Sequence, residues 1–261
     1  MRCSDADRPE PREEIPVGDV GDDEHREEEQ TYQEGSPHLV GVDRLAAIAP
    51  STVRDEVGVS TRVETLPNGV DVERFRPVET ADFRERHGLD GERPLVGYTG
   101  RHGHEKRLDT LVEAAAGLDV TLALAGDGPA RASLERLADE RDVDARFLGF
   151  LPREDLPALY TSLDAFVFPS PVETQGLVAL EANACGTPVV GVGAGALADT
   201  VVDGETGYNY PRGDTAAFAD AIDRTLAERE ALSEHCLDRR EETSVEHAVD
   251  RLADVYDSVT A

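Results

Sequence analysis

From Pro94 onward, short apolar runs alternate with segments of helical periodicity. The runs predict strands at residues 95–99, 120–125, 146–149, 165–168, 188–192 and 207–210. Between most of these runs apolar residues recur at i, i+3, i+4 and i+7, which predicts helices; Leu108, Leu111, Val112 and Ala115 are one example. Strands and helices that alternate in this way form right-handed βαβ crossovers. The sequence therefore predicts an α/β fold with a mostly parallel, doubly wound sheet covered by helices on both faces.

The charge of the chain excludes some partners. Asp and Glu total 55 against 26 Lys and Arg, so the formal net charge is −29. An excess of this size argues against general binding to nucleic acid or to an anionic membrane surface. Dense carboxylates and a near-absence of lysine favour a halophilic protein, in which salt screens the self-repulsion, over an ordinary acidic protein.

Cysteine content and hydropathy indicate in which cellular compartment the protein is expected. The three cysteines, Cys3, Cys185 and Cys236, are odd in number and widely spaced, which disfavours a disulfide framework or a zinc site. Cys185 ends an apolar helical segment and is most simply a small core residue. No apolar run approaches the length of a membrane span, and no signal peptide is recognisable. We therefore expect a cytoplasmic protein with no metal site.

The segment 164–191 carries the strongest chemical signal. It is interpreted as a buried strand, a tight loop, a short helix and a second buried strand. Glu173 and Glu181 lie eight positions apart across the junction of loop and helix, and Gly176 opens the helix. A helix start offers unpaired N–H groups and a positive dipole to a phosphate. The two carboxylates could accept hydrogen bonds from sugar hydroxyls, so the segment suits a sugar nucleotide.

Lys106 is the only lysine of the chain and lies five residues after Arg101. A single lysine in a chain whose other basic residues are arginines can occur by chance. A compact ammonium can also be required at one point where a planar guanidinium does not serve. Its place just beyond the carboxyl end of a predicted strand favours the second interpretation, because open α/β sheets bind ligands there.

The sequence Gly126-Asp127-Gly128-Pro129 follows a predicted strand and opens a helix. The two glycines and the proline are ordinary turn chemistry. The same loop could let a nucleotide base or ribose approach the backbone. The sequence leaves both interpretations open.

Three further patterns are weaker. Residues 191–196 match the dinucleotide fingerprint G-x-G-x-x-A, but on the fifth predicted strand of the domain, and the segment that follows is too short for a crossover helix. His102 and His104 form H-x-H without a third ligand nearby, which favours a solvated loop over a metal site. Glu173 and Glu181 come from one loop and helix, whereas a glycosidase pair must flank the scissile bond.

Four signatures, in order, resemble the donor-binding half of family-four retaining glycosyltransferases, which have the GT-B fold. They are Gly100-Arg101 with Lys106, the segment 126–129, Glu173 with Glu181 in ETQGLVALEA, and VVDGETGYNY at residues 201–210. The turn PNGVD at residues 67–71 resembles the segment before the interdomain crossover. The resemblance implies a Rossmann-like domain and a hexosyltransferase that uses a nucleotide-diphosphate sugar and retains configuration.

The resemblance also implies roles for particular residues. Arg101 and Lys106 would hold the donor diphosphate and stabilise the departing nucleotide, and Glu173 would bind sugar hydroxyls. Glu181 would hold the ribose. The remaining predicted binding residues are contributed by backbone at the loops and at the helix start: Gly100, Gly126, Gly128, Thr174, Gln175, Gly176 and Leu177. No cofactor, metal or covalent nucleophile is expected.

The chain departs from the family in its first part. Residues 1–36 hold 13 acidic residues and four arginines and are expected to be disordered, unless they reflect a misplaced start site or a broken gene. We expect a remnant of the acceptor domain with a linker at 37–90, the donor domain at 91–240 and a C-terminal helix at 241–261. The acceptor, a sugar or a lipid-linked sugar, would then need a partner chain, or the protein would be a non-catalytic sugar-nucleotide-binding module. The sugar, the base and the oligomeric state are left undetermined.

Overall fold

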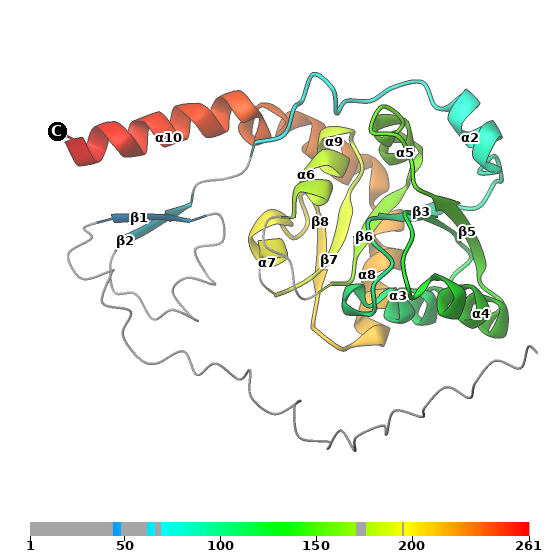
Figure 1. Cartoon of the computed structure of the whole chain (residues 1–261). Helices are drawn as coiled ribbons and strands as arrows, with labels where there is room; N and C mark the ends of the chain where they lie inside the picture. Colours follow the sequence, from blue (N-terminus) through cyan, green and yellow to red (C-terminus); the bar gives the residue numbers. More distant parts are fainter. Residues whose placement is uncertain (1–43, 48–61, 66–68, 171–175, 195, 261) are drawn as a thin grey trace, which may run out of the picture. The chain divides into compact units, whose positions relative to one another are not determined.

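The computed structural model describes residues 44–47, 62–65, 69–170, 176–194 and 196–260, all within one compact unit, Val42–Ala261. Its centre is a six-stranded sheet of order β5-β4-β3-β6-β7-β8, in which every neighbouring pair is parallel (Figure 1). The strands are β3 (Leu95–Thr99), β4 (Thr121–Ala125), β5 (Asp144–Gly149), β6 (Ala165–Phe168), β7 (Val189–Val192) and β8 (Gly207–Tyr210). The expected doubly wound parallel sheet is therefore confirmed.

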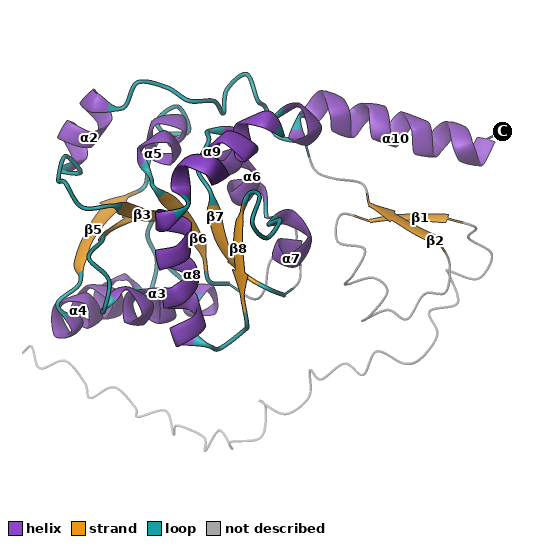
Figure 2. Cartoon of the chain, turned by 180° about the vertical axis from the view of Figure 1, so that it is seen from behind, coloured by secondary structure: helices purple, strands orange, loops and turns teal. Residues whose placement is uncertain are grey.

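Helices cover both faces of this sheet. On one face α8 (Thr215–Ala227) packs against α3 (Leu108–Ala115), which also contacts α4 (Arg131–Arg141); this layer is seen in Figure 2. The other layer consists of α5 (Leu156–Ser162), α6 (Leu177–Ala184) and α9 (Arg229–Asp238), with α6 in contact with the other two. The helices lie on two faces because the strand order runs outward from β3 to β5 in one direction and from β6 to β8 in the other.

The reversal of strand order between β3 and β6 marks the switch point of the sheet. The chain is fixed there by Asp164, whose carboxylate accepts a 2.6 Å hydrogen bond from the Leu95 amide at the start of β3. Leu95, Val96, Ala165 and Phe166 are buried on these two central strands. The carboxyl ends of these parallel strands lie at the opposite edge of the sheet, the place where such sheets bind ligands.

The segment before β3 contains a helix that the sequence interpretation missed. This segment was expected to contain only the linker, but α2 (Ala81–His87) forms there and ends at Gly88 with a left-handed φ of 62°. Phe83, its single buried residue, anchors the helix to the core. One apolar side chain in a highly charged segment gives no periodicity to detect.

Two further strands, β1 (Arg44–Ala47) and β2 (Arg62–Thr65), form a separate parallel pair. Residues 1–36 and the Pro67-Asn68 part of the predicted turn lie outside the described residues. The bounds of the four expected segments stay predictions.

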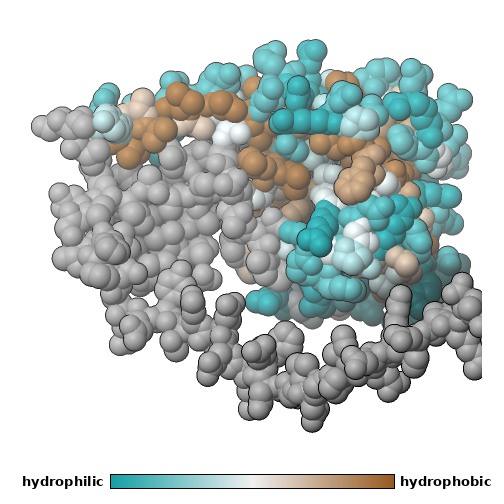
Figure 3. All heavy atoms as spheres, in the orientation of Figure 1, coloured by the Kyte–Doolittle hydropathy of each residue, from teal (hydrophilic) through white to brown (hydrophobic). Residues whose placement is uncertain are grey.

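The last helix, α10 (Val245–Thr260), presents an apolar stripe to solvent. Val245, Val249, Leu252 and Tyr256 recur at i, i+4, i+7 and i+11 and are 41–67% exposed. Figure 3 shows hydrophobic side chains gathered along this helix. An apolar stripe of this length is typical of an interaction surface. Within the part of the chain that the structure describes, no helix is long and apolar enough to span a membrane.

Candidate functional site

A cavity of about 690 Å³ opens at the carboxyl ends of β3, β4 and β5. The loops that follow these strands form most of its wall. Its lining residues are Thr99, Gly100, Arg101, Gly126, Asp127, Gly128, Pro129, Phe150, Leu151 and Leu156. The structure thus brings four predicted site residues together: Gly100, Arg101, Gly126 and Gly128. Their grouping follows from parallel pairing, which aligns the ends of strands that are distant in sequence.

Steric crowding explains why glycines occupy the 126–129 loop. It bears on both interpretations of this loop, as an ordinary turn and as a place where a nucleotide approaches the backbone. Gly126 has a φ of 116°, and a Cβ atom on it would lie 1.9 Å from the Gly100 carbonyl oxygen. A Cβ on Gly128 would lie 2.6 Å from the carbonyl oxygen of His102. The glycines therefore let two loops touch, which is more than turn chemistry, and the touching loops leave backbone at the cavity wall.

His102 lies beneath this junction and is fully buried, so the expected solvated loop is wrong at this position. Its amide donates to the Asp127 carbonyl (2.9 Å), and its carbonyl accepts from the Ala130 amide (2.9 Å). Burial lowers the pKa of the imidazole; the carbonyl of Ala125 opposes the shift, although neither ring nitrogen is in hydrogen-bonding geometry with a partner. His102 thus joins the two loops as a neutral core residue, while His104 is exposed.

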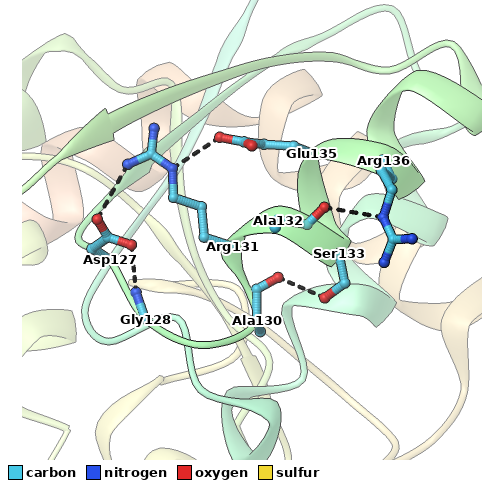
Figure 4. Close-up of polar contacts among 8 residues, drawn as sticks. All are labelled: Asp127, Gly128, Ala130, Arg131, Ala132, Ser133, Glu135 and Arg136. Atoms are coloured by element: carbon cyan, nitrogen blue, oxygen red, sulfur yellow. Dashed lines mark hydrogen bonds and ion pairs between the residues drawn. The ribbon is translucent and has the colours of Figure 1, made fainter. Parts of the chain in front are cut away.

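Asp127 at the cavity wall is held by a short chain of charges along α4 (Figure 4). One of its carboxylate oxygens accepts from the Gly128 amide at 2.7 Å, and the other lies 3.5 Å from the Arg131 guanidinium. Arg131 also contacts Glu135 at 2.9 Å, and the hydrogen bond to Glu135 raises its pKa. These contacts connect Asp127 to the first turns of α4.

The two predicted cationic residues lie in different places. Arg101 lines the cavity, and its carbonyl accepts a 3.2 Å hydrogen bond from the Tyr98 hydroxyl. Lys106 ends the one-turn 3-10 helix η2 (His104–Lys106) and is half-buried. It is not a lining residue of the cavity. Both residues follow β3 at the same edge of the sheet, but only Arg101 lines the cavity.

The predicted helix start at Gly176 is present. Gly176 has a φ of 61° and precedes α6 directly, so a residue with a side chain would be strained there. Leu177, the first residue of α6, is 38% exposed. The remaining predicted residues of this loop, Glu173, Thr174 and Gln175, lie outside the described residues.

Glu181 lies on α6 and forms a hydrogen bond with a buried tyrosine. The Tyr160 hydroxyl donates to its carboxylate at 2.9 Å. Burial raises the pKa of Glu181, while Tyr160 and Arg153 act in the opposite direction. Glu181 does not line the cavity. Its partner Tyr160 belongs to α5, and the first residue of that helix, Leu156, is a lining residue. The carboxylate is thus braced against the helix that closes one side of the cavity.

Sequence reasoning missed the apolar side of the cavity. Phe150 is 80% exposed, and Leu151 and Leu156 continue the same wall. They follow β5, an edge strand that no chemical motif marked. An aromatic residue directly after a strand and before Leu-Pro was the available signal, since a side chain placed there lies at the ligand-binding edge.

The rival nucleotide motif at 191–196 falls at the end of β7 and not on the first strand of the sheet. The helix after it, α7 (Ala196–Thr200), has five residues, which confirms the expected absence of a long crossover helix. A dinucleotide site of the usual kind requires both features. The described portion of the chain also holds no cluster of three or more His, Cys, Asp or Glu residues that could bind a metal.

Comparison with known sequences identifies relatives. The profile of the family "Glycosyl transferases group 1" matches residues 79–242. A 2-deoxystreptamine glucosyltransferase of Streptomyces kanamyceticus is 36% identical over 197 residues, which cover 71% of this chain and 51% of that protein. The chain spans about half the length of the curated relatives it matches.

Solved structures have the same architecture. Sucrose-phosphate synthase of Thermosynechococcus elongatus aligns with a TM-score of 0.72 and 31% identity, covering 84% of this chain and 59% of that chain. Anabaena Alr3699/HepE, in complex with UDP and glucose, aligns with a TM-score of 0.71 over 83% of this chain and 64% of that chain. Its identity of 21% supports the fold alone.

Proposed function

The chain belongs to the family of group 1 glycosyl transferases, and on that premise we propose that its large cavity binds the nucleotide of a nucleotide-diphosphate sugar. The family has the Rossmann-like, GT-B type of domain that the six-stranded sheet displays. The proposed activity is transfer of a hexose to an acceptor with retention of configuration. In this proposal the chain supplies the donor-binding half.

One observation carries the proposal: a single cavity joins two glycine loops, one arginine and an apolar wall. Phe150, Leu151 and Leu156 offer a surface on which a base can stack. The backbone at Gly126 and Gly128 carries no side chain that would keep a ribose away. Arg101 at the same wall offers a fork of donors to the diphosphate.

The proposed chemistry is electrostatic. Breaking the bond between sugar and diphosphate leaves negative charge on the departing nucleotide, which Arg101 and Lys106 would neutralise. The amides at Gly176 and Leu177 would add the positive end of α6. Glu173, with Thr174 and Gln175, would contact the donor sugar. The departing diphosphate would itself take the acceptor proton, so the proposal needs no metal and no covalent nucleophile.

Glu181 is proposed to accept hydrogen bonds from the ribose hydroxyls. A carboxylate has about four lone-pair sites, and Tyr160 uses one of them. The oxygen that Tyr160 does not occupy is the proposed ribose acceptor. The tyrosine would then fix the orientation of the carboxylate and lower the entropic cost of binding.

The acceptor side is proposed to come from a second polypeptide region. A sugar or a lipid-linked sugar is the expected acceptor. The exposed apolar stripe of α10 favours a partner surface next to the donor domain. The same observation favours a second candidate function, a module that binds a sugar nucleotide and transfers nothing by itself.

Calorimetry and a turnover assay test these proposals together. UDP, GDP and ADP, and their glucose or mannose conjugates, would be titrated into the purified chain in molar potassium chloride. We expect binding of at least one nucleoside diphosphate. Release of free sugar or transfer to an added acceptor would exclude the non-catalytic alternative. No affinity for any of the nucleotides would contradict the donor-binding proposal.

A further inference from the structure

A second cavity, of about 270 Å³, lies at the same edge of the sheet, between the first turns of α3 and α8. The ends of β6, β7 and β8 form its floor. Its lining residues are Arg107, Thr110, Pro169, Val192, Tyr210, Arg212, Gly213, Asp214, Thr215 and Phe218. None of them lines the nucleotide cavity, so the two cavities are separate.

Two arginines line this second cavity, one directly before α3 and one in the loop between β8 and α8. Arg107 precedes α3 with a left-handed φ of 52°, and its Nε lies 3.3 Å from the Asp109 carboxylate. Its two terminal nitrogens make no ion pair with any residue that the structure describes. Arg212 is exposed and makes no hydrogen bond or ion pair within the described part of the chain. Both arginines therefore keep guanidinium N–H donors that no described residue uses.

The Tyr210 hydroxyl is a third donor. Tyr210 is only 5% exposed, and its ring stacks on Phe218 with centroids 4.2 Å apart and an interplanar angle of 10°. Its hydroxyl has no hydrogen-bond partner among the residues described by the structure. Burial raises the pKa of this phenol, and the charge of Arg107 acts against the rise. A buried phenol normally finds a partner, so a hydroxyl that opens on a cavity and lacks one points to a ligand.

The helix start at this cavity adds to the positive potential. The 13-residue helix α8 begins at Thr215, which lines the cavity. The first backbone N–H groups of the helix, and with them the positive end of its dipole, therefore lie at the cavity. Asp214 is the only carboxylate in the lining, and it already caps the helix by accepting from the Ala217 amide at 2.9 Å. The lining therefore has two cations against one committed carboxylate.

We propose that this second cavity binds a phosphate group, either free or carried on a small molecule, with Arg107, Arg212 and the Tyr210 hydroxyl as its donors. Guanidinium groups match the tetrahedral oxygens of phosphate, and two of them balance a dianion. A chain of net charge −29 repels free anions, so two arginines at one cavity, each with guanidinium nitrogens outside any described ion pair, require a local reason. The site is independent of the proposed nucleotide-binding function.

Equilibrium dialysis with inorganic phosphate and with glucose 6-phosphate tests the proposal on the full chain. Arg212→Ala is expected to weaken binding at least about tenfold, since a charged donor is lost. Tyr210→Phe retains the stacked ring and is expected to weaken binding about fivefold. Arg136→Ala on the exposed surface of α4 removes the same charge and is expected to leave affinity unchanged.

The two probes separate the possible sources of the phosphate. Tighter binding of glucose 6-phosphate assigns the site to a phosphate ester, and tighter binding of inorganic phosphate assigns it to the free ion; either result supports the proposal. Unchanged affinity in both Arg212→Ala and Tyr210→Phe would overturn it. So would a loss of binding in Arg101→Ala with none in Arg212→Ala, because the phosphate would then occupy the nucleotide cavity. No binding of either probe overturns it as well.

Discussion

The two cavities at the carboxyl edge of the sheet are built by different means. The nucleotide cavity depends on backbone: Gly126 and Gly128 let two loops touch, and an apolar wall completes it. The cavity between α3 and α8 depends on side chains, with Arg107, Arg212 and Tyr210 around an apolar floor. A backbone wall suits an extended ligand with a flat base, whereas a ring of donors suits a compact anion. The two proposals together would give one fold two kinds of recognition at one edge.

The largest expected contrast is in stability. Gly126→Ala would place a Cβ 1.9 Å from the Gly100 carbonyl oxygen at a φ of 116°, so we expect a loss of about 3 kcal/mol in the free energy of unfolding. Gly213 in the second cavity has a φ of 81°, but no atom lies within 4 Å of a Cβ added there. For Gly213→Ala we therefore expect a loss of about 1 kcal/mol in the free energy of unfolding. Urea denaturation measures both. Equal losses would show that the loop contact does not hold the first cavity together.

Nucleotide affinity is expected to respond to the two cations near the first cavity. Arg101→Ala and Lys106→Ala should each weaken binding of a nucleoside diphosphate by roughly 1.5–3 kcal/mol, the usual cost of a lost charge-assisted hydrogen bond. Arg212→Ala is the matched control from the second cavity and should leave that affinity unchanged. Calorimetry measures each affinity. Full affinity in Lys106→Ala would remove Lys106 from the site, in keeping with its absence from the cavity lining.

A smaller effect is expected at the apolar wall. Phe150→Ala should weaken nucleotide binding by about 1–2 kcal/mol, because a stacking surface is lost. The side chain is 80% exposed, so the free energy of unfolding should change by less than about 0.5 kcal/mol. Leu237→Ala, at a partly exposed position away from both cavities, serves as the control. Unchanged nucleotide affinity in Phe150→Ala would place the base elsewhere.

The smallest expected effect concerns pH. Burial lowers the pKa of His102 in the folded protein, so the unfolded chain takes up a proton first as the pH falls below about 6.5. Stability should therefore decrease with falling pH through that window. Asp127 and Glu135 oppose the shift and Arg131 supports it. Thermal melts at pH 7 and pH 5 should show a smaller loss of stability in His102→Leu than in the unsubstituted protein. An equal loss in both proteins would assign the pH dependence to other groups.

The central strands could be predicted from the sequence because they are buried on both faces and form continuous apolar runs, as Val189–Val192 illustrates. The loops at Gly100 and Gly126 were predicted because a glycine directly after a strand usually marks a tight turn or a close approach of backbone. Phe150 was missed because only the parallel pairing of β4 with β5 brings it to the same edge. His102 was misjudged because its burial depends on a contact between two loops, which spacing along one of them does not show.

The proposed function requires that the glycine-lined cavity, and not its neighbour, receives the nucleotide. Backbone amide NMR during a titration with UDP or GDP tests this directly, because glycine amides resonate in a separate region of the spectrum. We expect the amide signals of Gly100, Gly126 and Gly128 to shift while that of Gly213 stays in place. A shift at Gly213 with the other three unmoved would contradict the assignment of the nucleotide to the first cavity.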